Sequence, residues 1–289
     1  MTFTTIKLIA FTIALSFSLN AQAFKLNLDF DKLKGVTEKV KQLKEPDEND
    51  EIELGKGISS NLLGAAPLVN DPELQAYVNQ VGKWLALHTD RPKLPWRFGV
   101  MDDDDVNAFA TPGGNIFITR GLLLRMRDEA ELAGVLAHEI SHVLEKHALN
   151  TMKKGAAIGL AGDVLNHYVE RKDKGDYTKL VNASTELYTR GLDKEDEFAA
   201  DRAGVVIAAR AGYDPYGLPS VLQTLSSINP KDGAVALMFK THPDSSERLE
   251  KVTGQMDGRL DNLAEQPRVA DRFARIMRAH VGRYQPAKR

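Results

Sequence analysis

The sequence of 289 residues contains no cysteine. This absence excludes disulfide bonds, thiolate metal ligands, a cysteine nucleophile and a lipid anchor attached to a cysteine. A chain of this length buries enough apolar surface to fold without disulfides. Any metal ion must therefore be held by histidine, aspartate or glutamate side chains.

An excess of charge is also lacking. The 38 basic and 40 acidic residues give a formal net charge of −2. Proteins that bind nucleic acid or an anionic membrane surface usually carry a clear positive excess, which concentrates them at the polyanion. The charge therefore gives no electrostatic case for either partner, and we expect no binding of nucleic acid.

Long apolar runs are absent except at the N-terminus. There, Lys7 precedes an apolar run from Leu8 to Leu19, and Ala21-Gln22-Ala23 follows as a small-x-small site. This order is typical of a cleavable secretory signal, and it predicts a signal peptide over residues 1–23 and a periplasmic location. A retained anchor is the alternative, but a bilayer span needs about 20 apolar residues. The mature chain is expected to have no transmembrane segment.

Residues 24–56 are polar and include the acidic run "KEPDENDEIE". Such a composition buries little apolar surface, so we expect a solvated, mobile segment.

The remaining residues, 57–289, are predicted to form a single domain, with its motifs between residues 95 and 252. Apolar residues recur at helical spacing through most of this region. The expected helices cover residues 71–85, 128–152, 180–212 and 268–281, with others after the turn at 213–217 and within 245–252. A strand over 96–100 and a hairpin turning at 111–114 complete the predicted fold, which is α+β and mostly helical.

The stretch "LAHEISHVLEKH" (136–147) lies in one of these helices. His138 and His142 are four residues apart, so they share a helix face and can bind one ion. Zinc suits two imidazoles, and Glu139 can take a proton from water without being a ligand. The alternative is a helix with incidental histidines. His147 falls five residues after His142, off this face, and is predicted to be an ordinary surface residue.

A third ligand must come from elsewhere in the chain. In "KEDEFAADRAG" (194–204), Glu197 and Asp201 share a helix face that is otherwise made of small and apolar residues. A carboxylate on a packed face needs a partner. Glu197 is therefore the predicted ligand, and Asp201 is predicted to orient a ligating histidine. Glu195 is the rival by type, but it points to a different face.

Five segments, taken in order, carry a resemblance to a known family. They are "NAFATPGGNIFITRGLL" (107–123), "HEISH" (138–142), "EFAADRAG" (197–204), "AGYDPYG" (211–217) and "THPDSSERL" (241–249). Together they resemble zinc metallopeptidase family 48, the HtpX-like and CAAX-prenyl-endopeptidase-like proteases, in a periplasmic soluble branch.

This resemblance implies a gluzincin-type metallopeptidase domain holding one Zn²⁺ per chain. The zinc ligands would be His138, His142 and Glu197, and Glu139 would be the general base. The edge strand of a small sheet would line the active-site cleft. Asn107 and Ala108 on that strand are expected to hold the substrate main chain by backbone pairing.

His242 and Arg248 belong to the same resemblance. Pro243 restricts His242 to an extended conformation, which suits a side chain presented from a loop. His242 is a candidate either for stabilising the oxyanion or for closing the site as a latency plug. Arg248 is a candidate for stabilising the oxyanion or for anchoring the loop on a carboxylate. A structural loop with a satisfied histidine is the alternative.

These features predict a zinc endopeptidase that cleaves unfolded or misassembled envelope proteins, with envelope-assembly machinery as a possible partner. The alternative function is a periplasmic chaperone or assembly factor with a largely latent metal site. Glu139 favours the enzyme, because a scaffold has no use for a general base.

Overall fold

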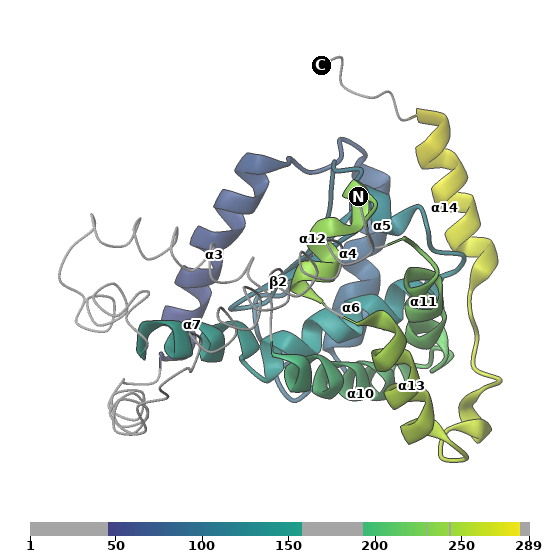
Figure 1. The fold of residues 1–289 in the computed structure, drawn as a ribbon. Helices are drawn as coiled ribbons and strands as arrows, with labels where there is room; N and C mark the ends of the chain where they lie inside the picture. Colours follow the sequence, from purple (N-terminus) through teal and green to yellow (C-terminus); the bar gives the residue numbers. More distant parts are fainter. Residues whose placement is uncertain (1–45, 158–192, 230, 243, 284–289) are drawn as a thin grey trace, which may run out of the picture. The chain divides into compact units, whose positions relative to one another are not determined.

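A long buried helix, α6 (Glu129–Leu144), lies at the centre of the described part of the protein in the computed structural model (Figure 1). The structure describes residues 46–157, 193–229, 231–242 and 244–283. Asp128 caps α6 by accepting a hydrogen bond from the backbone N–H of Glu131, and every residue from Glu129 to Val143 is buried. A helix buried on all sides needs other elements around it. The elements packed against α6 include α10, α11, α4 and strand β2.

The first half of the described chain holds the sheet and the central helix. Its elements are α3 (Glu48–Ala65), α4 (Pro72–Ala86), β1 (Arg97–Met101), β2 (Ala108–Thr111), β3 (Asn115–Thr119), α5 (Arg120–Leu123), α6 and α7 (His147–Ala157). The second half is helical where it is described. It contains α10 (Lys194–Arg210), α11 (Gly217–Ser226), η1 (Gly233–Val235), α12 (Ala236–Thr241), α13 (Ser245–Met256), η2 (Asp261–Leu263) and α14 (Ala270–Arg283).

The three strands form one small sheet in the order β1-β3-β2. β1 pairs parallel with β3, whereas β2 pairs antiparallel with it, Ala108 opposite Ile118. Gly113 and Gly114 have φ values of 75° and 95°, a left-handed backbone that glycine adopts without a steric penalty. The predicted strand and hairpin are therefore confirmed, and β2 is an edge of this sheet beside α6.

Helix α10 approaches α6 very closely at one glycine. A Cβ atom placed on Gly204 would lie 2.9 Å from the backbone nitrogen of His138. Real Cβ contacts are not that short, so only glycine allows this separation of the two helices. The contact sets the position of α10 relative to the histidines of α6.

The α+β, mostly helical prediction is confirmed, but the predicted helix over 128–152 is wrong in detail. The chain forms two helices there, because α6 ends at Leu144 and α7 begins at His147. Lys146 between them has φ 56°, which breaks the helix with a residue that rarely takes this conformation. Of the helix predicted over 180–212, α10 is described, and residues 180–192 lie outside the described part.

The predicted start of the domain at residue 57 falls inside α3. The expectation of a solvated segment is wrong for its last residues, since Glu48–Lys56 are helical and Glu51 is only 1% exposed. Glu51 accepts hydrogen bonds from Arg91 at 3.0 Å and from the backbone N–H of Gly113. An acidic residue of this run therefore anchors α3 to the hairpin turn. Residues 1–45, including the predicted signal peptide, lie outside the described part.

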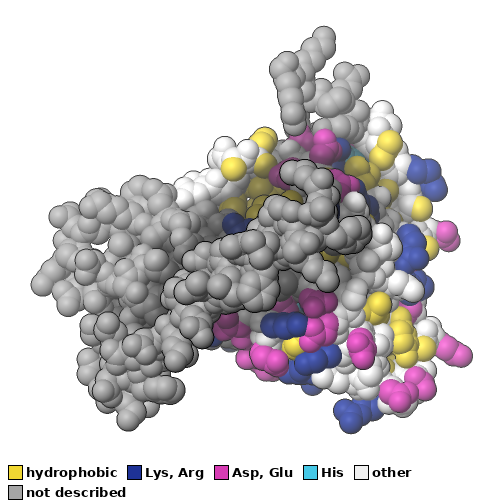
Figure 2. All heavy atoms as spheres, in the orientation of Figure 1, with side chains coloured by type: hydrophobic (Ala, Val, Ile, Leu, Met, Phe, Trp, Pro, Cys, Tyr) yellow, Lys and Arg dark blue, Asp and Glu magenta, His cyan; other side chains and the backbone are white. Residues whose placement is uncertain are grey.

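The described surface carries charges of both signs. On the face shown in Figure 2, Lys and Arg side chains lie interspersed with Asp and Glu side chains instead of gathering by sign. Within the described ranges, no helix has both the length and the apolar character needed to cross a membrane.

Candidate metal centre

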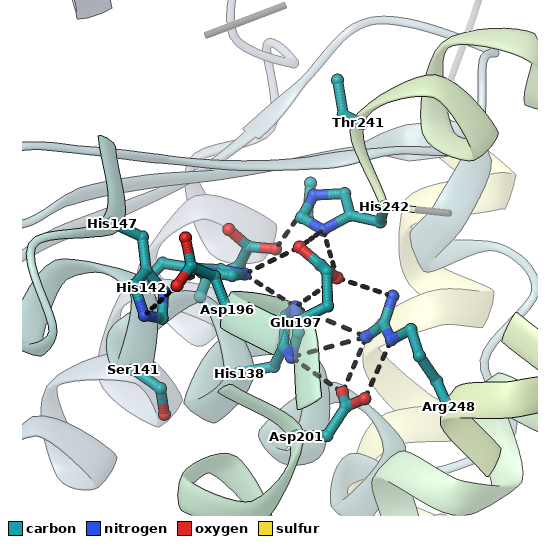
Figure 3. A network of polar contacts seen from close by, with 12 residues as sticks. His138, Ser141, His142, His147, Asp196, Glu197, Asp201, Thr241, His242 and Arg248 are labelled. Carbon is teal, nitrogen blue, oxygen red and sulfur yellow. Dashed lines mark hydrogen bonds and ion pairs between the residues drawn. The ribbon is translucent and has the colours of Figure 1, made fainter. Parts of the chain in front are cut away.

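His138 and His142 of α6 point to the same place, as their spacing predicts (Figure 3). Their Nε2 atoms lie 3.0 Å apart, and each residue is 4% exposed. Helix α10 brings Glu197 to the same point, with its carboxylate oxygens 3.7 Å from His138 Nε2 and 3.4 Å from His142 Nε2. Glu197 has no exposed surface, whereas its rival Glu195 is exposed.

His242, which ends helix α12, completes this group. Its Nδ1 atom lies 3.0 Å from both carboxylate oxygens of Glu197, and the residue is 7% exposed. One potential ligand atom from each of His138, His142, Glu197 and His242 falls within 4.8 Å of all the others. His242 has φ −130° and ψ 76°, outside the helical region, as expected for a residue before a proline. Pro243 itself lies outside the described residues.

These four side chains have the chemistry of a metal site. Two imidazole nitrogens that face each other at 3.0 Å need a proton or a cation between them, because their lone pairs repel. Two histidines and a glutamate form a ligand set that catalytic zinc uses. Glu139 Oε2, a buried oxygen beside them, has no hydrogen-bond partner in the described part of the chain. The residues therefore fit a zinc ion and a polar reactant next to it.

Arg248 and Asp201 hold the outer side of this group. Arg248 donates to Asp201 from Nε at 2.9 Å and from a terminal nitrogen at 2.7 Å, and Asp201 also lies 3.0 Å from His138 Nδ1. A third contact joins Arg248 to Glu197 at 3.0 Å. Asp201 is thus placed as predicted for a residue that orients a ligating histidine. Arg248 anchors α13 to two carboxylates of α10.

These contacts decide the charge of the buried carboxylates in the metal-free protein. Burial alone would raise the pKa of Glu197, but the charges of His242 and Arg248 hold it well below its usual range. Burial would also raise the pKa of Asp201, and Arg248 lowers it instead. Both carboxylates are therefore ionised at neutral pH and can bind cations.

Glu139 is in a different environment. It is 1% exposed, and burial is the main cause that raises the pKa of its carboxyl group. Its Oε1 atom lies 3.9 Å from Nε2 of His242, too far for a hydrogen bond. A carboxylate with a raised pKa is a better proton acceptor, so Glu139 is suited to general-base work.

His147 is not the surface residue that its position five residues after His142 predicts. It is 5% exposed, and its Nδ1 atom lies 2.8 Å from Nδ1 of His142. Asp196 of α10 lies behind it, with an oxygen 3.6 Å from Nε2 of His147. No sequence signal marks this contact, since the backbone reversal at Lys146 that makes it involves neither glycine nor proline.

The edge strand β2 reaches the same centre. Asn107 and Ala108 line a small cavity together with His138, Glu139 and His242. The carbonyl of Asn107 accepts from Thr119 of β3, so the backbone groups of the next residue, Ala108, face away from β3. Asn107 Nδ2 is buried and has no partner within the described ranges. Both residues thus lie where the sequence predicts the cleft.

The rest of this cavity is apolar. Arg248 is the exception among these lining residues. The apolar walls come from α5, α6, α11 and α12, with all side chains buried, namely Leu122, Val135, Leu218, Val221, Leu222, Leu225 and Met238. This apolar lining was not predicted, because helix periodicity alone cannot tell a core residue from one that faces a substrate.

Comparison with known proteins identifies the family. The sequence profile of peptidase family M48 matches residues 72–256. The chain belongs to peptidase family M48. The resemblance described from its motifs is therefore confirmed.

Several curated proteins are similar over most of this family M48 chain. The beta-barrel assembly-enhancing protease of Escherichia coli K12 is 31% identical over 205 residues, 69% of this chain and 42% of that protein. Metalloprotease YcaL of the same organism is 31% identical over 201 residues, 65% of this chain and 75% of YcaL. The mitochondrial metalloendopeptidase OMA1 of Arabidopsis thaliana is 30% identical over 156 residues, 54% of this chain and 30% of that protein. The chain spans less than half the length of the first of these relatives.

The family, the names of the relatives and the buried group of four agree on the class of protein. The chain is a member of peptidase family M48, and the relatives named above are proteases by name. Its mostly helical fold, small sheet and potential His and Glu metal site match the predicted gluzincin-type domain.

Proposed function

We propose that this chain is a zinc-dependent endopeptidase of the cell envelope that cleaves unfolded or misassembled proteins. The observation that carries the proposal is the convergence of two histidines and a glutamate beside a buried carboxylate without a hydrogen-bond partner, Glu139 Oε2. His138, His142 and Glu197 would hold the metal, one Zn²⁺ per chain. When bound, zinc supplies Lewis acidity, which polarises a carbonyl group and makes water at the site more acidic.

The residues of the chain divide the remaining work. Glu139 takes the proton from water as water attacks the peptide carbonyl, and it then delivers this proton to the departing amine. Arg248 keeps Glu197 and Asp201 ionised, and Asp201 orients His138. The N–H of Ala108 donates to Asn107 Oδ1 at 3.0 Å, so its carbonyl, which faces away from β3, is the group that pairs with the substrate main chain. Asn107 Nδ2 is a donor for a substrate carbonyl.

The cavity supports the choice of substrate. Its walls are apolar apart from Arg248, and they adjoin Glu139 and the edge strand. A small apolar side chain placed there would lose contact with water, which is favourable at about 25 cal/mol per Å². Folded proteins bury such side chains, whereas unfolded or misassembled ones expose them in extended segments. An edge strand also accepts only an extended peptide. Both features select unfolded chains.

The envelope location rests on the N-terminal sequence and on one relative. Residues 1–23 have the order of a secretory signal. A similar protein is named for beta-barrel assembly, so envelope-assembly machinery is the proposed partner class. Recovery of a mature protein starting at Phe24 from a periplasmic extract would support export, and retention of residues 1–23 would count against the signal peptide.

A chaperone or assembly factor with a latent site is the second candidate. One observation favours it: His242 lies within ligand distance of the other three groups and so closes the open position that catalysis needs. The two candidates differ in whether an unfolded protein is cleaved.

Cleavage of casein by zinc-loaded protein separates them. We expect wild-type protein to cleave casein and Glu139→Gln to lose about 10²- to 10⁴-fold in rate while it retains zinc, because the general base alone is removed. Glu195→Gln, a matched change of an exposed glutamate on α10, should keep wild-type activity. If metal-loaded wild-type protein cleaves no casein, the proposal of an enzyme is wrong. If Glu139→Gln cleaves casein as fast as wild type, the proposed role of Glu139 is wrong.

A further inference from the structure

The centre contains one buried histidine that the proposed mechanism does not use. His147 is 5% exposed and contacts His142 through their two Nδ1 atoms at 2.8 Å. A buried polar side chain in a close contact of this kind needs a reason, because burying an imidazole without a partner is unfavourable. The partner here is itself one of the proposed zinc ligands.

The backbone is shaped to make this contact. On a continuous helix, residues 142 and 147 would point about 140° apart at 100° per residue. Lys146 instead adopts φ 56°, which ends α6 and starts α7 so that the ring of His147 returns to His142. A non-glycine residue in this region costs on the order of 1 kcal/mol and persists only where the surrounding structure requires it. Lys146 directly follows the C-cap residue Glu145, a position where many helices end in this conformation, and here the reversal brings His147 to His142.

The hydrogen bond has one direction that is compatible with metal binding. Nε2 of His142 faces His138 and Glu197, so it must carry a lone pair to bind a metal, which places the ring proton on Nδ1. His142 then donates from Nδ1 to the unprotonated Nδ1 of His147. The proton of His147 is consequently on Nε2, which faces Asp196 at 3.6 Å. Asp196 precedes Glu197 on α10. One turn of this helix therefore provides both the proposed ligand Glu197 and the carboxylate that faces Nε2 of His147.

We propose that His147 is a positioning residue that fixes the tautomer and the ring orientation of His142 for zinc binding. It plays for His142 the part that Asp201 plays for His138. Each histidine ligand thus has its own partner at Nδ1, one a carboxylate and the other a neutral imidazole. This inference rests on the proposed zinc site, but it concerns zinc affinity and not the cleaved substrate.

The test is the dissociation constant of zinc, measured by competition with a chromophoric chelator at fixed pH. Removing the hydrogen-bond partner of a metal-binding histidine typically weakens metal binding about 10- to 100-fold. We expect a weakening of this size in His147→Leu, which fills the space without an acceptor. His88→Leu changes a histidine at the end of α4 that contacts Trp84, and it should bind zinc like wild type.

A second pair of variants keeps the test valid if His147→Leu does not fold. The amide oxygen of His147→Asn falls near the position of Nδ1, whereas His147→Gln reaches toward the position of Nε2. The two differ by one methylene group, and urea unfolding of each variant in a chelator shows whether both are folded. We expect zinc affinity within about threefold of wild type for Asn and a loss of about tenfold or more for Gln. If His147 served only to fill space, zinc affinity would not be higher in His147→Asn than in His147→Gln.

The outcomes separate this inference from the proposed function. If wild type binds zinc and the Leu or Gln variant binds it equally well, His147 is not a positioning residue. If Gln retains zinc better than Asn, the assigned contact through Nδ1 is wrong. If wild type itself binds no zinc, the metal site of the proposed function fails first.

Discussion

At the scale of single residues, Glu197 and Asp201 are almost fully buried carboxylates, and the side chains around them explain how the fold tolerates their charges. An isolated buried carboxylate would take up a proton or destabilise the fold. Arg248 contacts both, at 3.0 and 2.7 Å, and His242 adds a second partner for Glu197. The two acids can therefore stay ionised before any metal binds.

Replacing Arg248 should reveal this dependence. Arg248→Met should lower the free energy of unfolding of the metal-free protein by about 3–5 kcal/mol at neutral pH, because two buried charges lose their cation. Arg202→Met, a matched change of an exposed arginine on α10, should have little effect. Urea unfolding of the three proteins in a chelator measures both values, and equal losses would contradict the role of Arg248.

The pH dependence follows from the same contacts. The folded-state pKa values of Glu197 and Asp201 are lowered from 4.5 and 3.8, so their stabilisation is complete above these values and is lost as pH falls below them. Wild-type metal-free protein should therefore lose stability below about pH 4, where unfolded carboxylates take up protons. Arg248→Met should lose less on acidification, since protonation relieves its unpaired carboxylates. A parallel acid dependence in both proteins would contradict this assignment.

His242 is the residue whose two candidate roles predict opposite results. From its place within the group of four we infer the latency plug, in which His242 would occupy the position that a reactant needs. His242→Ala should therefore raise the rate of casein cleavage by zinc-loaded protein, and Thr241→Ala next to it serves as the control. A large fall in rate would favour stabilisation of the oxyanion, and an unchanged rate would remove His242 from the active site.

At the scale of elements, the separation of α6 and α10 decides the geometry of the centre. α6 carries His138 and His142, α10 carries Glu197 and Asp201, and the two helices approach each other closely at Gly204. Because glycine has no side chain, α10 can come close enough to α6 to place Glu197 beside the two histidines.

An added methyl group at Gly204 should move the two helices apart. Gly204→Ala places Cβ 2.9 Å from His138 N and 3.0 Å from its Cα, so the backbones must shift. We expect a loss of about 1–3 kcal/mol in unfolding free energy, as is typical of overpacking, together with weaker zinc binding. Gly254→Ala on α13 meets nothing within 4 Å and should stabilise the protein by about 0.5–1 kcal/mol. Equal stability and zinc affinity in the two variants would contradict the close-approach argument.

At the scale of the whole molecule, the proposed zinc site connects distant parts of the chain. Its potential ligands come from α6, from α10 and from the end of α12. An ion bound by all three exists only in the folded state, so metal binding and folding are coupled.

Removal of zinc should therefore lower the melting temperature. With free zinc at about 1,000 times its dissociation constant, binding contributes about 4 kcal/mol, which corresponds to roughly 8–16 °C for a domain of this size. Calorimetry of chelated and zinc-saturated protein measures the shift, and magnesium should not reproduce it because it prefers oxygen ligands. Identical melting temperatures would contradict a zinc site that joins the three elements.

Much of this protein could be predicted because the patterns are local. Helical spacing predicts that His138 and His142 share a face, and the packed face of "EFAADRAG" selects Glu197 over Glu195. The hairpin follows from the two glycines at its turn. In contrast, the break at Lys146 was not predictable, because lysine does not favour φ 56° and the long-range contacts of its neighbours hold it there.

The sequence by itself determined most of the elements, the family and the residue types of the centre, because these depend on periodicity and on motifs within a few residues. Only the tertiary structure decided that His147 contacts His142, that Asp196 lies beside His147, and that His242 joins the group of four. It also showed that apolar side chains of α11 and α12 line the cavity next to Glu139. These are contacts between segments far apart in the chain, or across a backbone reversal, and their geometry is fixed by packing and not by local propensity.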